Sequence, residues 1–132
     1  MAVLLIIDEY AGFREVMGYC LPGFGHCAVG AVDGGEARRI ARERRVDVVL
    51  VDAGRRGEGF KTCADFKQDE RLKHLPVVIM SNLLTRDAAT KAAAVGAASI
   101  VTKPFEWESF LSLIERLTRA GGAPPPAAVS PP

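Results

Sequence analysis

The chain has 132 residues, of which 48% are hydrophobic and 25% charged, a composition typical of one globular domain with a single core. Its 17 basic and 16 acidic residues give a net charge of +1, which argues against direct binding to nucleic acid. No apolar run reaches the roughly 18 residues of a membrane span, and the apolar start at residues 1–7 lacks the basic flank of a signal peptide. We therefore expect a cytoplasmic protein without a membrane partner.

Short apolar runs alternate with segments of helical periodicity. The runs cover Val3–Ile7, residues 46–51, 76–80 and 99–101 and, more weakly, 26–29. Such runs, rich in β-branched residues and without polar alternation, are typical of strands buried on both faces of a parallel sheet. Apolar residues recur at the spacing of one helix face in residues 13–20, 37–41, 88–93 and 110–117. The pattern predicts an α/β fold, a doubly wound five-stranded parallel sheet with five helices.

The last residues differ in composition from the rest. Five of the eight prolines fall within residues 121–132, after Gly121 and Gly122. Such a segment cannot build a core and favours extended conformations. We therefore expect a folded domain over residues 1–120, followed by a disordered Pro-rich tail or a truncated linker at 121–132.

The three cysteines, Cys20, Cys27 and Cys63, are an odd number and form no Cys-x-x-Cys pair. Neither a disulfide framework nor a zinc site fits this spacing, so we expect buried thiols. His26 stands beside Cys27, but neighbouring residues in a strand point to opposite faces. We do not expect the two side chains to share a metal.

Polar residues follow four of the predicted strands. They are Asp8 and Glu9 after the first strand, Asp52 after the third, Ser81 and Asn82 after the fourth, and Lys103 and Pro104 after the fifth. The carboxyl ends of parallel strands lie along one edge of the sheet, where ligands bind in doubly wound folds. Each residue alone could be a helix cap or a solvated loop residue. Carboxylates that gather at one edge need a cation among them, and their oxygens suit Mg²⁺.

This ordered set of residues resembles the receiver domain of bacterial two-component response regulators, of the kind found in chemotaxis regulators. The resemblance extends over about residues 2–118, and the stretches 33–37, 75–79 and 95–97 also match the family. It implies a flavodoxin-like fold with the strand order 2-1-3-4-5, an order for which the chemotaxis regulator is a standard example.

The resemblance also implies a phosphorylation site. Asp52 would be the phosphoacceptor, and Asp8 and Glu9 would be the acidic pair that holds Mg²⁺ together with Asp52. The backbone carbonyl of Gly54 would be a further metal ligand. A carboxylate that attacks a phosphoryl group needs the charge of that group to be offset, which Mg²⁺ and a nearby ammonium can do.

Two further residues would meet the phosphoryl oxygens, Ser81 and Lys103. The charge of an acyl phosphate would draw both toward Asp52 and so move the loops that carry them, which would make the site a switch. The bond between Lys103 and Pro104 is usually cis in the family, and we expect the same here.

The sequence departs from the family at three places. Ile100 stands where receiver domains usually have an aromatic residue whose rotation accompanies switching. The loop after the phosphoacceptor is one residue shorter and carries Arg55 and Arg56, and we expect one of these cations to approach the phosphoryl group. Asn82 and Leu83 are bulkier or drier than the family's usual residues, so we expect slow loss of the phosphoryl group.

The leading hypothesis is a phosphorylation-switched signalling module that accepts a phosphoryl group from a histidine kinase or a histidine phosphotransfer protein and thereby alters its binding to a downstream partner. It would modify only itself and turn over no external substrate. The alternative is a receiver-like interaction domain that acts without phosphorylation. A small phosphohydrolase or flavin carrier fits less well, because no Gly-rich phosphate loop or Asp-x-Asp pair is present. The resemblance also implies a possible homodimer through the fourth helix, fifth strand and fifth helix, near Lys91, Ile100 and Arg116.

Overall fold

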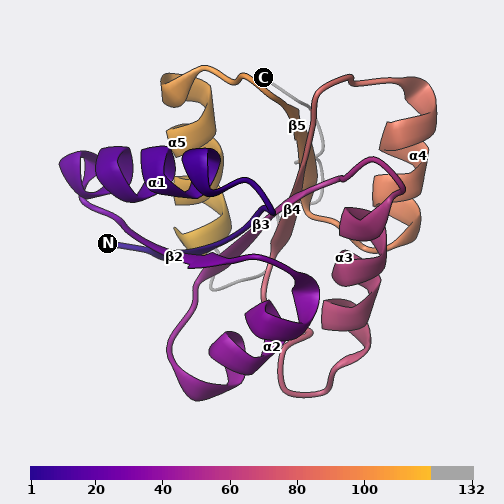
Figure 1. Cartoon of the computed structure of the whole chain (residues 1–132), viewed down its shortest axis with the longest axis horizontal. Helices are drawn as coiled ribbons and strands as arrows, with labels where there is room; N and C mark the ends of the chain where they lie inside the picture. Colours follow the sequence, from indigo (N-terminus) through magenta and orange to yellow (C-terminus); the bar gives the residue numbers. More distant parts are fainter. Residues whose placement is uncertain (120–132) are drawn as a thin grey trace.

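Strands and helices alternate along the chain in the computed structural model, which describes residues 1–119 (Figure 1). The strands are β1 (Val3–Ile7), β2 (Cys27–Ala31), β3 (Val48–Asp52), β4 (Val77–Ser81) and β5 (Ser99–Thr102). The α-helices are α1 (Ala11–Cys20), α2 (Gly34–Glu43), α3 (Glu58–Gln68), α4 (Arg86–Ala94) and α5 (Trp107–Arg119), and the short 3-10 helix η1 (Leu21–Phe24) follows α1. The predicted tail at 121–132 lies outside the described residues.

All strand pairs in the sheet are parallel, in the order β2-β1-β3-β4-β5. The predicted fold class and strand order are thereby confirmed. The chain crosses from β1 to β2 on one side and then returns to β3 on the other, so the strand order reverses between β1 and β3. In doubly wound sheets, ligands bind at the carboxyl ends of the strands that flank this reversal.

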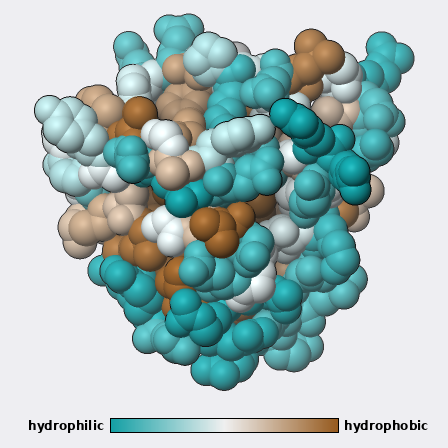
Figure 2. Space-filling model, viewed as in Figure 1, coloured by the Kyte–Doolittle hydropathy of each residue, from teal (hydrophilic) through white to brown (hydrophobic). Residues whose placement is uncertain are grey.

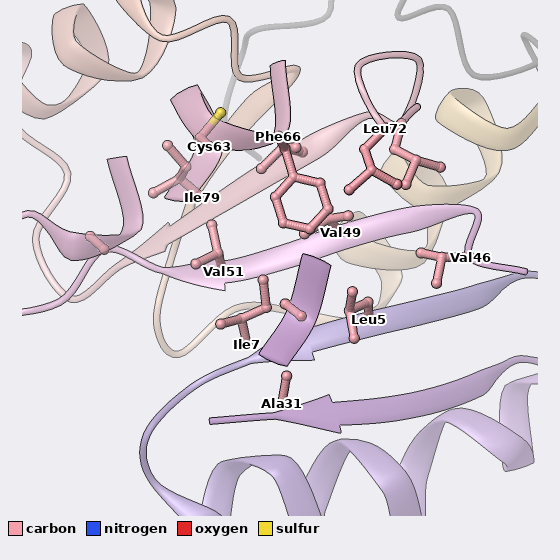
Figure 3. Close-up of a cluster of buried hydrophobic side chains, with 14 of the residues drawn as sticks. Leu5, Ile7, Ala31, Val46, Val49, Val51, Cys63, Phe66, Leu72 and Ile79 are labelled. Atoms are coloured by element: carbon pink, nitrogen blue, oxygen red, sulfur yellow. The ribbon is translucent and has the colours of Figure 1, made fainter. Parts of the chain in front are cut away.

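Alternate residues of the strands build two hydrophobic cores, one on each face of the sheet. Leu5, Ile7 and Val49 belong to the core beneath α2, α3 and α4, where Phe66 is fully buried (Figure 3). The neighbouring strand residues belong to the core beneath α1 and α5; in β1 these are Leu4 and Ile6. Figure 1 shows the same division of the helices between the two faces. The apolar runs lack polar alternation because both faces of each central strand are covered.

The weak second run is explained by the position of β2 at the edge of the sheet. Three of its five residues are half-buried and only Ala31 is buried, whereas all residues of β1 are buried. β3 begins at Val48, later than the predicted residue 46. Asp47 lies just before the strand, and its carboxylate accepts a hydrogen bond from the backbone N–H of Val3 at 2.7 Å. The apolar residues of β3 therefore begin only after Asp47.

Some predicted core residues lie nearer the surface. Val16 is 52% exposed, because the buried face of α1 is narrower than the sequence spacing suggests and centres on Met17. The prediction of buried thiols holds for Cys63 but is wrong for Cys20 and Cys27, which are half-buried. Cys27 lies in the edge strand, which no further strand covers. The surface seen in Figure 2 is mainly hydrophilic, with hydrophobic residues exposed in small areas between polar ones.

Candidate functional site

Three strand ends bring two carboxylates and one amine together. Ile7 and Val51 are paired in register, so Asp8 and Asp52 come next to each other at the carboxyl ends of β1 and β3. The Lys103 Nζ lies 2.6 Å from Asp8 Oδ2 and 3.2 Å from Asp52 Oδ1. The sequence-predicted convergence of these three residues therefore exists in the structure, although they are far apart along the chain.

Asp8 is the most deeply buried member of this group, and its side chain is 0% exposed. Its Oδ1 accepts a hydrogen bond from the backbone N–H of Tyr10 at 2.9 Å, and its Oδ2 faces Lys103. Its backbone N–H donates to the carbonyl of Ala31 and its carbonyl accepts from Arg14 Nη1. Since a buried carboxylate is stable only when it is paired and hydrogen-bonded, these contacts hold Asp8 in one orientation.

Asp52 is more accessible, with 23% of its side chain exposed. Its Oδ2 accepts a hydrogen bond from the backbone N–H of Gly54 at 3.0 Å, in a turn where Gly54 has a φ of +80°. Gly59, in the first turn of α3, lies directly against the backbone of Asp52 and Ala53. The loop can pass this close only because Gly59 has no side chain.

Lys103 reaches both carboxylates from the loop after β5. Its backbone N–H donates to the carbonyl of Ser81 at 2.8 Å, and its bond to Pro104 is cis, as expected. The ammonium also lies over the ring of Phe13, 3.9 Å from the ring centroid. Only 16% of the Lys103 side chain is exposed, so its charge acts in a poorly solvated environment.

The donor chemistry fits a hard divalent cation. The carboxylates of Asp8 and Asp52 already bind the positively charged ammonium of Lys103 between them. Carboxylate oxygens are also the ligands that Mg²⁺ prefers. Glu9 is exposed at the rim. In residues 1–119 no three His, Cys, Asp or Glu side chains are gathered at metal-binding distances. The cation that the sequence analysis required among these carboxylates is, in this structure, the Lys103 ammonium.

A pocket of about 290 Å³ opens beside Asp52. It is lined by Glu9, Tyr10, Asp52, Ala53, Gly54, Arg55, Ser81, Asn82 and Leu83. The Ser81 hydroxyl donates to the carbonyl of Leu83 at 2.9 Å and accepts from its N–H at 3.3 Å. The structure thus places Ser81 at the pocket, with its hydroxyl bonded within its own loop. Asn82 and Leu83 are both exposed there.

The two arginines of the short loop are exposed, and Arg55 lines the pocket. Neither guanidinium has a carboxylate within 4 Å among the described residues. Hydrogen bonds from the backbone N–H of Glu58 itself and from the backbone N–H of Arg56, the latter 2.8 Å from Glu58 Oε1, lower the pKa of Glu58. The Glu58 carboxylate lies against Gly54, in space that a side chain there would fill. Sequence reasoning did not single out Glu58.

Ile100 is 1% exposed and belongs to the core beneath α2, α3 and α4. It therefore offers no surface to the proposed dimer face, whereas Lys91 and Arg116 are exposed. Phe13 was predicted only as a core residue, and Arg14 was not predicted at all. Both residues lie in the first turn of the helix that follows Asp8, and this position could have indicated that their side chains lie near the site.

The fold and the site define a doubly wound α/β domain with an acidic site at the carboxyl ends of β1 and β3, where the strand order reverses. Residues 4–115 match the family described as the response regulator receiver domain. The chain belongs to this family, as the resemblance of its motifs indicated. Receiver domains are signalling modules, and the acidic site is consistent with phosphorylation-switched signalling. Within residues 1–119, no helix has the length and apolar character needed to cross a membrane.

The chain is similar to several named bacterial proteins. The chemotaxis protein CheY of Pseudomonas aeruginosa is 29% identical over 116 residues, covering 86% of this chain and 94% of that protein. Protein PilH of the same bacterium is 30% identical over 118 residues, covering 86% and 95%. The DNA-binding dual master transcriptional regulator RpaA of Synechocystis is 28% identical over 129 residues, and the chain spans 54% of its length. The solved structure of Vibrio cholerae CheY4 has a TM-score of 0.80 at 26% identity, covering 88% of this chain and 98% of that one.

Proposed function

We propose that this protein accepts a phosphoryl group on Asp52 from a histidine kinase or a histidine phosphotransfer protein and that phosphorylation alters its binding to a protein partner. The observation that carries the proposal is the carboxylate of Asp52, which is paired with Lys103 and open to a pocket of about 290 Å³. A nucleophile must be both oriented and accessible, and Asp52 is the member of the buried pair that meets both conditions.

The transfer step makes one bond and breaks one. An Asp52 oxygen forms a bond to phosphorus, the bond between phosphorus and the donor's imidazole nitrogen breaks, and the bonding electrons leave with that nitrogen. The product is an acyl phosphate. Lys103 faces Asp52 Oδ1 and the N–H of Gly54 faces Oδ2, so the carboxylate is held while charge builds up beside it.

Asp8, Glu9 and Asp52, with the carbonyl of Gly54, would hold Mg²⁺. The metal, when bound, supplies positive charge that offsets the charge of the transferring group. Asp8 is already fixed by its bond from Tyr10 N–H, so it would bind a cation without losing conformational freedom.

The acyl phosphate would recruit the Ser81 hydroxyl. Ser81 would then exchange its bond to the Leu83 carbonyl for a phosphoryl oxygen, and the loop from 81 to 85 would rearrange around it. Lys103 would follow the added negative charge on Asp52. Both loops lie at the surface, so the rearrangement would change the face offered to a partner.

Arg55 and Arg56 would supply further positive charge. Arg55 lines the pocket, and neither side chain is committed to an ion pair in the described part of the chain. We expect a variant with both residues changed to Ala to be phosphorylated more slowly and to depend more strongly on Mg²⁺. Rates and Mg²⁺ dependence equal to those of the wild type would contradict this role.

Intact-mass analysis after treatment with acetyl phosphate tests the proposal most directly. The wild type should gain the mass of one phosphoryl group when Mg²⁺ is present and should gain none when EDTA replaces Mg²⁺. Asp52→Asn should gain none under either condition. Asp87→Asn is the matched control, because Asp87 is exposed on α4 and pairs with Lys91. A phosphoryl group that persists in Asp52→Asn, or that is absent from the wild type, would refute the assignment.

The second candidate is an interaction domain that does not use phosphorylation. It is favoured by the existing bonds of the site, because Lys103 is already paired with Asp52 and Ser81 is already bonded to Leu83. Beryllofluoride with Mg²⁺ mimics an acyl phosphate and separates the two. A change in thermal stability that disappears in Asp52→Asn supports the phosphorylation switch, and no change in either protein supports the alternative.

A further inference from the structure

The contact between Phe13 and Lys103 has no role in the function proposed above. An ammonium has three N–H groups, and the geometry directs the Lys103 ammonium toward Asp8, Asp52 and the ring face of Phe13. A cation within about 6 Å of a ring centroid is attracted by the negative face of the ring, and more strongly where water is excluded. The distance of 3.9 Å and the 16% exposure of Lys103 satisfy both conditions.

The ring is held in place by the same segment that holds Asp8. Phe13 lies in the first turn of α1, is half-buried and packs against the core that contains Met17. The turn before it is fixed by the bond from Tyr10 N–H to Asp8 Oδ1. Asp8 and the ring of Phe13 therefore form a rigid pair of contacts around the amine.

The lysine side chain, in contrast, has a flexible four-carbon stem and could reach solvent or either carboxylate alone. Contacts that surround the ammonium on several sides remove these alternatives. The two carboxylates attract it, and the ring covers it. The ring thus favours the arrangement in which Lys103 bridges Asp8 and Asp52 over arrangements that leave the carboxylates free.

We propose that Phe13 is a positioning residue that holds the Lys103 ammonium across Asp8 and Asp52 and thereby sets how readily a divalent cation enters the site. A divalent cation that uses the same carboxylate oxygens competes with the ammonium for them. The second part of the proposal rests on the proposed function, because it concerns the Mg²⁺ that phosphorylation would require. The first part concerns only the unmodified protein.

The first test is the NMR signal of the Lys103 side chain. Protons held over an aromatic ring face shift upfield, so the Lys103 Hε protons should be shifted upfield in the wild type. The shift should be lost in Phe13→Leu and kept in Phe13→Tyr, which retains the ring. Phe24→Leu, at the end of η1, is the matched control, because Phe24 contacts Trp107 and should leave the shift unchanged. A Lys103 signal that is the same in Phe13→Leu and in the wild type would overturn the positioning role.

The second test is Mg²⁺ binding to the unphosphorylated protein, measured by calorimetry. Phe13→Leu should bind Mg²⁺ roughly five- to thirtyfold more tightly, the factor that corresponds to a cation–π contact that is largely shielded from water. The same substitution in a Lys103→Met background should change the affinity by much less, since no ammonium remains to be held. An equal effect in both backgrounds would show that Phe13 acts through packing alone. A wild type that keeps the upfield shift but neither binds Mg²⁺ nor becomes phosphorylated would refute the proposed function and leave the placement of Lys103 standing.

Discussion

The close approach of Gly59 to the phosphoacceptor strand gives a prediction whose size can be worked out. A Cβ at position 59 would lie 2.7 Å from the Cα of Ala53 and 2.8 Å from the carbonyl carbon of Asp52, and still closer to the Asp52 oxygen. Carbon atoms pack favourably at about 3.5 to 4.0 Å. The atoms in the way are backbone, so the first turn of α3 or the end of β3 must move by about 1 Å.

Gly59→Ala should therefore destabilise the fold and disturb the site. Overpacking costs about 1 to 3 kcal/mol, and replacing Gly by Ala in a helix returns about 0.5 to 1 kcal/mol. We expect a net loss of about 1 to 2 kcal/mol in the free energy of unfolding. Because the displaced carbonyl group of Asp52 is bonded to the Cα that carries its side chain, the contact between Asp52 and Lys103 should also be disturbed and phosphorylation by acetyl phosphate should slow.

Gly18→Ala is the matched control. Gly18 lies in α1, is exposed, and a Cβ there would meet nothing within 4 Å. This variant should gain about 0.5 to 1 kcal/mol and keep its rate of phosphorylation. Urea denaturation gives both free energies, and intact-mass time courses give both rates. If Gly59→Ala is as stable and as readily phosphorylated as Gly18→Ala, the backbone at Gly59 does not lie as close to Asp52 and Ala53 as the structure indicates.

Three further predictions concern an ion pair, a buried thiol and a residue of the pocket. The hydrogen bond from Arg42 holds the pKa of Asp69 below its usual value, so this carboxylate stabilises the fold above about pH 4 and loses that contribution as the pH falls through its lowered pKa. In Arg42→Gln, the free energy of unfolding should depend less on pH in the acid range than it does in the wild type. An equal slope of this free energy against pH in the two proteins would contradict this. Burial raises the pKa of Cys63 from 9.0 to about 11, so its contribution to stability is complete below pH 9 and is lost as the pH rises to 11. The stability difference between the wild type and Cys63→Ala should shrink by roughly 2 kcal/mol over that range, and a constant difference would refute it. If Asn82 obstructs water at the acyl phosphate, Asn82→Ala should shorten the phosphoryl lifetime several-fold after the donor is removed, and an unaltered lifetime would exclude that role.

The parallel sheet could be predicted from the sequence because its physical signals were strong, whereas the strand order was implied only by the resemblance to receiver domains. Runs such as Val3–Ile7 are short, apolar throughout and rich in β-branched residues, which is typical of a strand covered on both faces. The signal was weaker where coverage is partial. β2 is an edge strand and was predicted with shifted ends, and Val16 was assigned to the core although it lies at the margin of the buried face of α1. Periodicity gives the direction of a side chain but not the width of the surface that covers it.

The convergence of the site was predictable for the same reason, since parallel strands end along one edge. The partners of each side chain were not. Nothing in the spacing of Asp8, Asp52 and Lys103 indicates that the amine lies between the two carboxylates, because that depends on side-chain conformation. The contact of Ser81 with Leu83 depends likewise on the path of a loop. Sequence patterns thus indicate which groups meet and leave open which bonds they form.

The arrangement of charges has a consequence for how the site would respond to a cation. Two carboxylates with one ammonium between them keep one net negative charge, so the pocket still attracts a cation although Lys103 is present. Asp8 cannot turn away, because its side chain is fully buried and its second oxygen is bonded to Tyr10 N–H. Lys103 is the mobile partner, since it alone is attached by a long flexible stem. Any change of occupancy at this site must therefore be accommodated mainly by movement of the lysine. Its contact with Phe13 opposes this movement together with its ion pairs to Asp8 and Asp52.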